Sequence, residues 1–215
     1  MTRLAFYDLD GTLVSSNVVD QYLWYARRTS VWRIVRALLR APQWILAERK
    51  SRLRFNELFF REYAGLSEAF LRSNAAAMTK DVLQPALFAG AQEKLAQDGV
   101  AGFRLILVTG SLDFAIEGFA RELGFAEVLA NRMEFRDGVA QGRLVEPVLA
   151  ESVKVAAVLQ ACERYGADPR ECKAYSDSTS DVPMLEAVGE PYAVNPSSGL
   201  RKIAEARQWP VVTLK

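Results

Sequence analysis

The chain has 215 residues, of which 50% are hydrophobic, and it carries a formal net charge of +1. It is long enough for one α/β domain with an insertion, and its charge gives no general attraction to nucleic acid. The absence of histidine excludes Ser-His-Asp and Cys-His hydrolases, zinc sites with histidine ligands, and histidine as a general base.

The sequence shows no sign of a membrane span or a secretory signal. Its longest stretch without Asp, Glu, Lys or Arg is residues 82–92, whereas a helix needs about 20 apolar residues to cross a bilayer. The first residues lead directly into a strand-like run. Cys162 and Cys172 are the only cysteines, and we expect reduced thiols. We therefore expect a cytoplasmic protein, or one held peripherally at the inner face of the membrane.

The first predicted element is a strand at residues 3–7, a short apolar run. In residues 15–80 apolar side chains recur every three to four positions, which predicts helices and no strand. We expect Pro42 to break this helical stretch. We also expect Gly65-Leu66-Ser67 to end one helix and to cap the next.

Beyond residue 80, strands and helices alternate. The predicted strands span 104–108, 127–135, 139–145, 172–176, 191–194 and 211–214, and the predicted helices span 89–98, 112–123, 152–165, 182–188 and 197–206. Arg136-Asp137-Gly138 predicts a hairpin turn between two of the strands.

This alternation indicates an α/β fold, a Rossmann-like doubly wound parallel sheet with helices on both faces. The helical stretch interrupts the alternation, so we interpret it as an insertion. We assign residues 1–15 and 81–215 to the core domain and residues 16–80 to a small α-helical cap inserted after the first strand.

Polar side chains follow three of the predicted strands at the point where each strand ends. Asp8-Leu9-Asp10 follows the first strand, Thr109-Gly110-Ser111 the second, and Asp177 to Asp181 the strand at 172–176. Ligands of doubly wound sheets lie beyond the carboxyl ends of the strands, so we expect these groups to converge. Lys154, at the start of a predicted helix, joins the same cluster.

Two aspartates two positions apart can divide the work of phosphoryl transfer. Asp8 is ionised at neutral pH, so it needs no histidine to act as a nucleophile, and its attack would form an aspartyl-phosphate. Asp10 can give a proton to the leaving group if neighbouring negative charge raises its pKa. It can then deprotonate the water that hydrolyses the intermediate.

A phosphate dianion among several aspartates requires cations. We expect Mg²⁺ to be held by Asp8, by Asp177 and by a backbone carbonyl, that of Asp10, with waters completing an octahedron. Lys154 and the hydroxyl and amide groups of Thr109 and Gly110 would bind the other phosphoryl oxygens. Each motif alone has a simpler explanation, as a turn, a helix cap or a surface lysine. Their common placement at one sheet edge favours a site.

In this order the motifs resemble those of the haloacid dehalogenase-like phosphatases, in the branch that contains phosphoserine phosphatase. The matching segments are Asp8-Leu9-Asp10-Gly11-Thr12, Val108-Thr109-Gly110-Ser111, Lys154 and Ser176 to Asp181, with further likeness at Ala130-Asn131-Arg132 and at the hairpin turn. The resemblance implies a Rossmann-like core with a helical cap, Mg²⁺ dependence and a phosphorylated Asp8. It implies that Asp181 belongs to the surroundings of the metal, and that Asp10 marks a phosphatase and not a dehalogenase.

Three positions depart from the phosphoserine enzymes. Those enzymes carry a glutamate nine residues after the nucleophile, for the substrate amine, where this chain has Asn17. They carry an arginine seven residues after a cap phenylalanine, for the substrate carboxylate. Counted from Phe55, that position is Glu62, with Arg61 beside it. A glycine often stands three residues before the motif lysine, and Glu151 in its place is expected to affect the local turn.

These departures predict a phosphomonoester other than phosphoserine as the substrate, such as a lipid phosphate or another small phosphomonoester. Phosphoserine itself and amino-alcohol phosphates of the histidinol-phosphate type are the alternatives. The residues expected to select the substrate are Asn17, Arg52, Arg54, Phe55 and Arg61.

Residues 21–54 hold nine Lys and Arg residues against Glu48 alone, interleaved with aromatic side chains. Arg33, Arg36 and Arg40 fall on one face of a predicted helix. Such a segment can lie on an anionic membrane, rim a pocket for a polyanionic substrate, or form a solvated surface whose tryptophans pack on the core. The layout loosely resembles bacterial phosphatidylglycerophosphate phosphatases of the same branch.

Two other classes of protein share parts of the pattern. A receiver-like phosphoacceptor also uses Asp, Thr, Lys and Mg²⁺, but its phosphorylated Asp lies on a later strand and it has no cap. A non-catalytic lipid-binding or partner-binding module would not need the intact set of Asp8, Asp10, Thr109, Lys154 and Asp177. The expected partners are a small-molecule or lipid phosphomonoester and, at the cap, an anionic membrane surface, with no nucleic acid.

Overall fold

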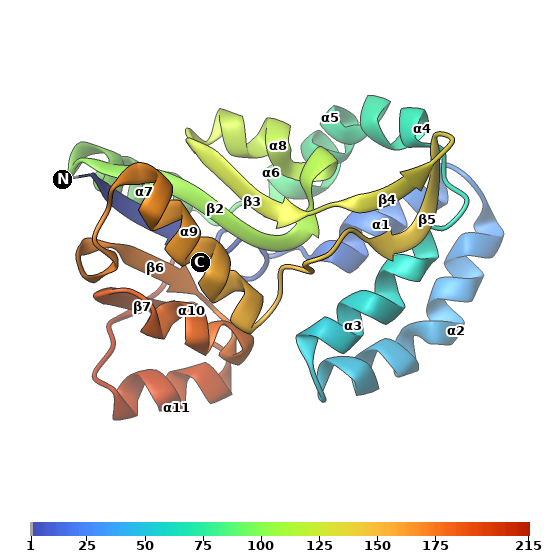
Figure 1. The fold of residues 1–215 in the computed structure, drawn as a ribbon. Helices are drawn as coiled ribbons and strands as arrows, with labels where there is room; N and C mark the ends of the chain where they lie inside the picture. The colour runs from blue at the N-terminus through green and yellow to red at the C-terminus, as the bar shows by residue number, and fades with distance from the viewer. Residues whose placement is uncertain (1) are drawn as a thin grey trace.

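The computed structural model describes residues 2–215 and contains a six-stranded sheet flanked by helices (Figure 1). All the strands run in parallel, in the order β3-β2-β1-β6-β7-β8. Their bounds are β1 Arg3–Tyr7, β2 Phe103–Leu112, β3 Glu127–Asn131, β6 Lys173–Ser176, β7 Glu190–Val194 and β8 Val211–Val212. The predicted α/β class and the doubly wound parallel sheet are confirmed.

Alternate residues of the central strand β1 point into two separate cores. Leu4 and Phe6 pack against α9, α10 and α11, whereas Ala5 and Tyr7 belong to the cluster that α7, α8 and the helices after β1 complete. The bounds are α7 Ala91–Val100, α8 Asp113–Glu122, α9 Ser152–Tyr165, α10 Val182–Glu186 and α11 Ser198–Ala206, with the 3₁₀ turns η3 Pro169–Glu171 and η4 Thr179–Asp181. Because helices cover both faces, the inner strands are apolar along their length.

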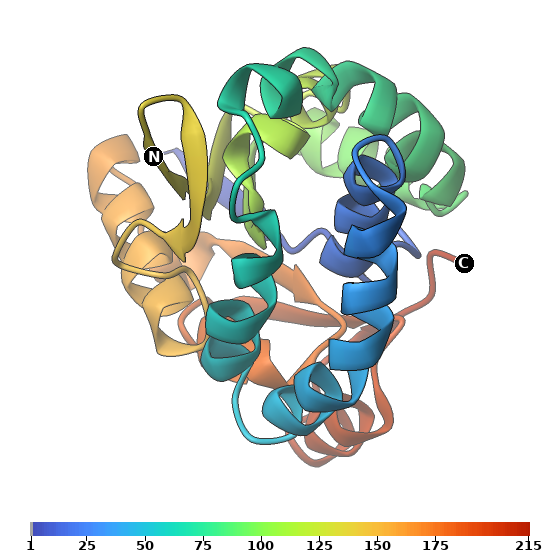
Figure 2. The same ribbon diagram turned by 90° about the vertical axis from the view of Figure 1, so that its right-hand side faces the viewer.

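Between β1 and β2 the chain forms a group of helices at one end of the molecule, which faces the viewer in Figure 2. Their bounds are α1 Val18–Arg27, α2 Val31–Glu48, α3 Arg52–Phe59, the 3₁₀ turn η1 Phe60–Tyr63, α4 Glu68–Ser73, α5 Ala75–Met78, the π-helical turn η2 Thr79–Leu83 and α6 Gln84–Ala86. As predicted, a helical turn ends just before Gly65, and Ser67 caps the next helix by accepting a hydrogen bond from the Phe70 amide at 3.4 Å.

The predicted break at Pro42 is wrong, because α2 continues through this residue. A proline inside a helix removes one backbone hydrogen bond and costs about 3 kcal/mol. Here Pro42 lies on the exposed side of α2, where water can satisfy the freed carbonyl, while Trp44 and Ala47 are buried on the other side. Burial of those two side chains anchors the second half of the helix and offsets the cost.

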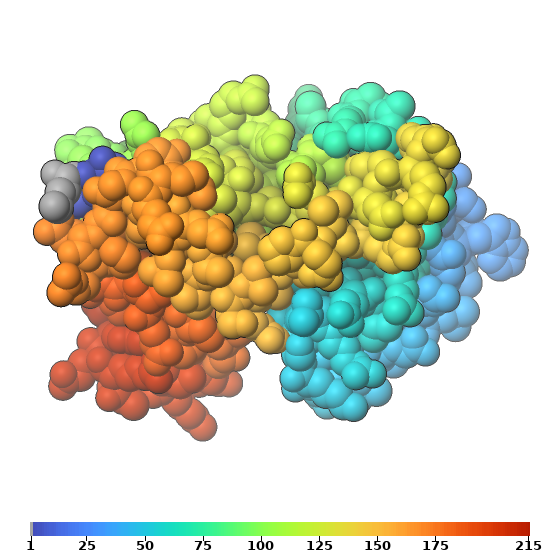
Figure 3. Space-filling model, viewed as in Figure 1, coloured from blue at the N-terminus to red at the C-terminus, as the bar shows by residue number. Residues whose placement is uncertain are grey.

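A hairpin of β4 Met133–Arg136 and β5 Val139–Leu144 stands outside the main sheet. Its turn has φ 51° at Asp137 and 72° at Gly138, the positive values of the Asp-Gly turn that was predicted. The hairpin lies against the inserted helices (Figure 3). The Gly65 amide donates to the Ala140 carbonyl at 2.9 Å, and the Ala140 amide donates to the Leu66 carbonyl at 2.9 Å.

Two predicted strand bounds differ from the structure. Residues 127–135 are not one strand, since β3 pairs with β2 as far as Asn131 and β4 then pairs only with β5. The chain leaves the sheet there because the Asn131 side chain holds the Gly110 carbonyl and the Leu149 amide. The strand expected to stop before Thr109 continues to Leu112.

Two further features of the described residues bear on the sequence-based expectations. Within residues 2–215 we find no helix with the length and hydropathy needed to cross a membrane. Cys162 and Cys172 are buried free thiols with their sulfur atoms 3.9 Å apart.

Asp98 is a buried acid that joins α7 to two strands of the sheet. It accepts hydrogen bonds from the hydroxyls of Tyr7 at 2.5 Å and Tyr175 at 2.7 Å, and from the ammonium groups of Lys94 at 3.1 Å and Lys173 at 2.9 Å. Burial favours the neutral acid, but these four donors prevail and hold the pKa of Asp98 below its usual value.

We expect Asp98→Asn to lower the free energy of unfolding by about 3 kcal/mol at neutral pH, because it leaves two partly buried lysines without their counter-charge. The folded pKa of Asp98 is lowered, so the stabilisation is complete above the unfolded pKa of about 3.9 and is lost as the pH falls through the folded value. Urea unfolding from neutral to acidic pH would show the two proteins converging in acid. A difference independent of pH would contradict the charge argument. The exposed Asp137→Asn is the matched control, for which we expect little change.

Candidate active site

The carboxyl ends of β1 and β6 lie side by side at the place where the strand order reverses. In a doubly wound sheet this is where ligands bind. A cavity of about 280 Å³ opens there, lined by residues of the loops after β1 and β6, by Gly110 in β2, by residues 149–151 and Lys154 at the start of α9, and by residues 15–17, 48 and 52. Four polar segments that are distant in sequence therefore meet at one cavity.

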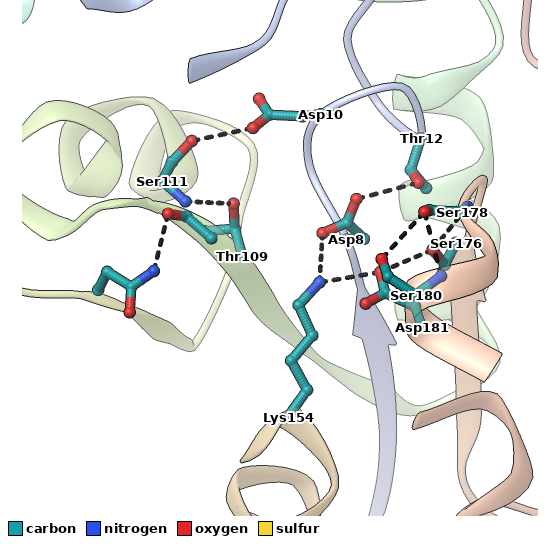
Figure 4. Close-up of polar contacts among 12 residues, drawn as sticks. Asp8, Asp10, Thr12, Thr109, Ser111, Lys154, Ser176, Ser178, Ser180 and Asp181 are labelled. Carbon is teal, nitrogen blue, oxygen red and sulfur yellow. Dashed lines mark hydrogen bonds and ion pairs between the residues drawn. The ribbon is translucent and has the colours of Figure 1, made fainter. Parts of the chain in front are cut away.

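The ammonium group of Lys154 joins two carboxylates at the floor of this cavity (Figure 4). Its Nζ donates to Asp8 Oδ1 at 2.8 Å and to Asp181 Oδ2 at 2.9 Å, and all three side chains are buried. Ser176 donates to the same Asp181 oxygen at 2.8 Å. The hydroxyl of Thr12 lies 3.4 Å from the second oxygen of Asp8. Asp8 is thus fixed in position from both sides.

Asp10 has a separate set of partners. Its carboxylate points toward Ser111 in Figure 4 and accepts a hydrogen bond from that hydroxyl at 3.2 Å. Gln21, on α1, donates to Ser111 Oγ at 3.0 Å and lies 3.5 Å from the other Asp10 oxygen. The two aspartates of the first motif are therefore held by different groups, Asp8 by a cation and Asp10 by neutral donors.

Asp177 lies directly against the loop that carries the first motif. Gly11 has φ 80°, and a Cβ atom at this position would be 2.3 Å from Asp177 Oδ2. Only glycine permits both this backbone conformation and this close approach. The glycine of the motif thus brings the carboxylates of two neighbouring strand ends together.

The acids outnumber the cations within the cavity. Burial and the charge of Asp8 raise the pKa of Asp10 to about 7, and burial with Asp8 and Asp181 raises that of Asp177 to about 7. Burial also raises the pKa of Asp8, against the effect of Lys154. Burial disfavours the Lys154 ammonium, but Asp181 and Asp8 raise its pKa. Four carboxylates around one buried ammonium leave surplus negative charge.

Hard oxygen donors with surplus negative charge suit a divalent cation such as Mg²⁺. Nowhere in residues 2–215 do three or more His, Cys, Asp or Glu side chains form a closed metal cage. Mg²⁺ is usually held by one or two carboxylates together with waters and substrate phosphate. Asp8 and Asp177 on the cavity wall provide such a pair.

The second motif contributes backbone groups as well as side chains. Gly110 lines the cavity, whereas Thr109 is fully buried and its Oγ1 accepts a hydrogen bond from the Ser111 amide at 3.1 Å. The Asn131 amide donates to the Gly110 carbonyl at 2.9 Å, and its oxygen accepts from the Leu149 amide at 2.7 Å. Thr109 and Asn131 thereby fix the conformation of the end of β2 around Gly110, which faces the cavity.

The residues expected to select the substrate are only partly brought together. Asn17 and Arg52 line the cavity, and Phe55 lines an adjoining groove with them. Arg54 is exposed and Arg61 lines a different cavity, near the hairpin. The Asn17 side chain accepts a hydrogen bond from the Val19 amide at 2.8 Å, as the N-cap of α1.

The structure adds residues that the sequence did not point to. Gln21 and Ser111 hold Asp10, and Asn56 lies beside the second motif. Asn56 is fully buried, neither polar atom of its side chain has a partner, and its Nδ2 is 3.9 Å from the place of a Cβ on Gly110. Ser111 belongs to the second motif, Val108-Thr109-Gly110-Ser111. Gln21 and Asn56 lie in the helical stretch of residues 15–80, where the sequence pattern predicts helix packing and gives no sign of a functional role.

Sequence comparison relates the chain to known hydrolases. A sequence model of the haloacid dehalogenase-like hydrolase family matches residues 5–186. A Mycobacterium tuberculosis protein named a probable phosphatase is 36% identical over 150 residues, covering 70% of this chain and 52% of the relative. This chain thus spans about half the length of that relative. The phosphoserine phosphatase SerB1 of the same organism is 32% identical over 224 residues, covering 98% of this chain and 70% of SerB1.

Structure comparison supports the same assignment. A Bordetella pertussis protein of unknown function superposes with a TM-score of 0.86 at 32% identity, with full coverage of both chains. A phosphoserine phosphatase solved as an analogue of its phospho-aspartyl intermediate has a TM-score of 0.74 at 20% identity, covering 100% of this chain and 94% of that one, which shows a shared fold. The family predicted from the motifs is confirmed, and the chain belongs to the haloacid dehalogenase-like hydrolases.

Proposed function

We propose that the chain is an Mg²⁺-dependent phosphomonoester hydrolase that works through a phosphorylated Asp8. One observation carries the proposal: Asp8 lies at the floor of the cavity with Lys154 at one of its oxygens, and Asp10 lies two residues away on separate partners. This arrangement places a nucleophile and a proton donor on one loop. Relatives named as phosphatases support the same reaction class.

In the first step an Asp8 oxygen attacks the phosphorus atom and the bond from phosphorus to the ester oxygen breaks. The ester oxygen leaves as an alcohol after taking the proton of Asp10, which Ser111 and Gln21 hold toward the cavity. Lys154 balances the charge at Asp8, and the Gly110 amide at the cavity would bind a phosphoryl oxygen. The buried Thr109 hydroxyl supports Gly110 from behind through the Ser111 amide.

In the second step Asp10 takes a proton from water, and the resulting hydroxide attacks the phosphorus atom. The bond from phosphorus to Asp8 breaks, which releases inorganic phosphate and restores the Asp8 carboxylate. Asp10 thus returns to its protonated form within one cycle, as a single group acting first as acid and then as base requires.

Asp8, Asp177 and the backbone carbonyl of Asp10 would hold Mg²⁺, with Asp181 supporting them through Lys154. When bound, the ion neutralises charge on the phosphoryl oxygens. The surplus of buried carboxylates and the glycine that lets Asp177 approach the first motif both fit this role.

We assign residues 1–15 and 81–215 to the core domain and residues 16–80 to the cap. The catalytic groups come from the core, whereas Asn17, Glu48 and Arg52 come from the segment assigned to the cap and line the same cavity. This division leaves the choice of leaving group to the cap.

Asp8→Asn should reduce Mg²⁺-dependent hydrolysis of p-nitrophenyl phosphate by at least about 10⁴-fold, because it removes the nucleophile. Asp10→Asn should reduce it by about 10²–10⁴-fold, the usual contribution of a general acid. Steady-state rates check both predictions. The mass of the acid-quenched enzyme checks the intermediate, because it would show one added phosphoryl group. Wild-type rates in Asp8→Asn would refute the assignment, and Asp137→Asn on the exposed hairpin tip is the matched control.

The unpartnered side chain of Asn56 is evidence for a ligand that binds beside Gly110. A buried amide without partners costs about 1–3 kcal/mol, and such a group calls for an explanation, such as strain, a catalytic role or a bound water or ion. Both polar atoms of Asn56 lack partners, and its Nδ2 lies 3.9 Å from the place of a Cβ on Gly110, which borders the catalytic cavity. Asn56 itself lines the neighbouring cavity near the hairpin. We propose that Asn56 donates a hydrogen bond to the bound substrate.

Asn56→Leu should therefore leave the free energy of unfolding unchanged or raise it by about 1 kcal/mol, because no hydrogen bond is lost in the free protein. The same change should lower kcat/KM by about tenfold or more, the effect of one donor lost from the bound state. Asn131→Leu is the control, since its amide holds two backbone groups and both stability and activity should fall. Equal losses of stability in the two variants would contradict the role of Asn56.

The space beside the catalytic cavity favours an apolar leaving group. A groove of about 290 Å³ shares Asn17, Glu48 and Arg52 with the cavity. Its other lining residues are apolar, namely Val18, Val19, Ala41, Trp44, Ile45 and Phe55. We propose a phosphomonoester whose alcohol carries an apolar chain, with the chain in this groove.

Phosphoserine is the second candidate, because the relative SerB1 is named a phosphoserine phosphatase. In addition, Glu48 could bind the amine of the substrate and Arg52 its carboxylate. Two observations disfavour it: Asn17 carries no charge, and the carboxylate of Glu62 is completely buried between Arg36 and Arg40.

We expect kcat/KM for an alkyl or lysolipid phosphate below its micellar concentration to exceed that for phosphoserine by at least about tenfold, since each buried methylene contributes about 0.8 kcal/mol. Phosphate release from a matched panel measures this ratio. A preference for phosphoserine would reject the apolar substrate while leaving the Asp8 mechanism intact. Phe55→Ser should lower the ratio of kcat/KM for the apolar substrate to kcat/KM for phosphoserine. Val100→Ser, at an exposed position, should leave this ratio unchanged.

A further inference from the structure

The outer side of α2 is an exposed apolar stripe. Its members recur at helical spacing and point away from the rest of the protein, and they are Val31, Trp32, Val35, Leu38, Leu39, Pro42, Ile45 and Leu46. Trp32 is 76% exposed and Leu39 is 75% exposed. Large apolar residues scattered singly on a surface are normal, but a continuous exposed stripe marks an interaction site.

The inner side of α2 carries the buried side chains of Ala37, Trp44 and Ala47, and three arginines beside them bind Glu62. Arg36 Nε and Arg40 Nη1 donate to the Glu62 carboxylate at 2.8 and 2.7 Å, and Arg33 donates to the Glu62 carbonyl at 2.9 Å. Because Glu62 is fully buried, these contacts fix the rotation of α2 about its axis. The apolar stripe is therefore held outward by ion pairs on the opposite side.

We propose that α2 docks on the surface of an anionic lipid bilayer, with the apolar stripe at the boundary between headgroups and acyl chains. An amphipathic helix with apolar residues on one side and basic residues around them has the composition of such an anchor. The proposal goes beyond the hydrolysis itself and does not rest on it, since docking needs no turnover.

Charge around the stripe favours a bilayer over a second copy of the chain. Arg27 before α2 and Arg49, Lys50 and Arg54 after it are exposed and form no ion pair within residues 2–215. A two-fold dimer through this face would bring the same surface of each copy together, and so would set these cations against their own copies. Anionic headgroups are the complementary partner.

The position of α2 agrees with this role. The helix forms the right-hand edge of the molecule in Figures 1 and 3 and faces the viewer in Figure 2. Ile45, a member of the stripe, also lines the apolar groove that adjoins the catalytic cavity. A chain leaving the bilayer beside α2 would therefore meet the groove directly.

Vesicle binding tests the proposal on the 215-residue chain. Sedimentation with vesicles of equimolar phosphatidylcholine and phosphatidylglycerol should capture the protein at low salt, and capture should weaken with phosphatidylcholine alone or at high salt. Trp32 is the one strongly exposed tryptophan, so tryptophan emission should shift to the blue and be quenched by brominated lipid. Absence of binding to the anionic vesicles would overturn the proposal.

The double variant Leu39→Gln/Leu46→Gln should weaken capture by at least about tenfold, because two apolar groups no longer enter the interface. Glutamine forms helices well, and hydrolysis of p-nitrophenyl phosphate should stay unchanged. Val100→Gln, a replacement of a side chain that is 92% exposed on α7, is the matched control and should bind like the wild type. Undiminished capture of the double variant would reject this face.

Light scattering during size-exclusion chromatography tests whether the apolar stripe binds a second copy of the chain instead of a bilayer. We expect a monomer at the concentrations used for vesicle binding. A dimer that dissociates in Leu39→Gln/Leu46→Gln would show that the stripe binds a second copy and would overturn the proposal. In Asp8→Asn we expect hydrolysis to be lost and vesicle capture to be undiminished, which would show that docking does not depend on catalysis.

Discussion

The buried ammonium group of Lys154 is the contact on which the rest of the site depends. It comes from α9 and holds Asp8 after β1 and Asp181 in η4, so three segments distant in sequence meet at one nitrogen atom. A buried ion without partners costs several kcal/mol, and removing one partner of a buried pair is strongly destabilising. The same contact therefore assembles the fold at this edge and orients the carboxylate proposed as nucleophile.

Two loop conformations around this contact are unfavourable for most residues. Gly11 has φ 80°, with no room for a side chain beside Asp177. Glu151 has φ 48°, a conformation that favours glycine and costs another residue about 1–3 kcal/mol. Its carboxylate accepts a hydrogen bond from the Arg52 amide at 2.7 Å. That bond links the start of α3 to the start of α9, so the segment that lines the groove is coupled to the helix that carries Lys154.

The sequence predicted the sheet and the motif positions because both depend on local patterns. Apolar runs followed by Asp or Thr-Gly mark strand ends, and parallel strands bring those ends to one edge. Other features depend on contacts between distant segments. α2 continues through Pro42 because Trp44 and Ala47 are buried, and Gln21 reaches Asp10 only once α1 packs over the second motif. Asn56 could not be recognised either, since its distinguishing property is the absence of partners in the folded chain.

Glu62 connects the proposed substrate to the proposed docking surface. In the phosphoserine enzymes that the chain resembles, this position carries an arginine for the substrate carboxylate. A buried glutamate here removes that cation and also needs counter-charges of its own, which Arg36 and Arg40 supply. Arg36 and Arg40 turn toward Glu62 while their side chains stay partly exposed, and the apolar side of α2 faces away from that contact. Glu62 thus supports both proposals, a substrate other than a zwitterion and the docking of α2 on lipid.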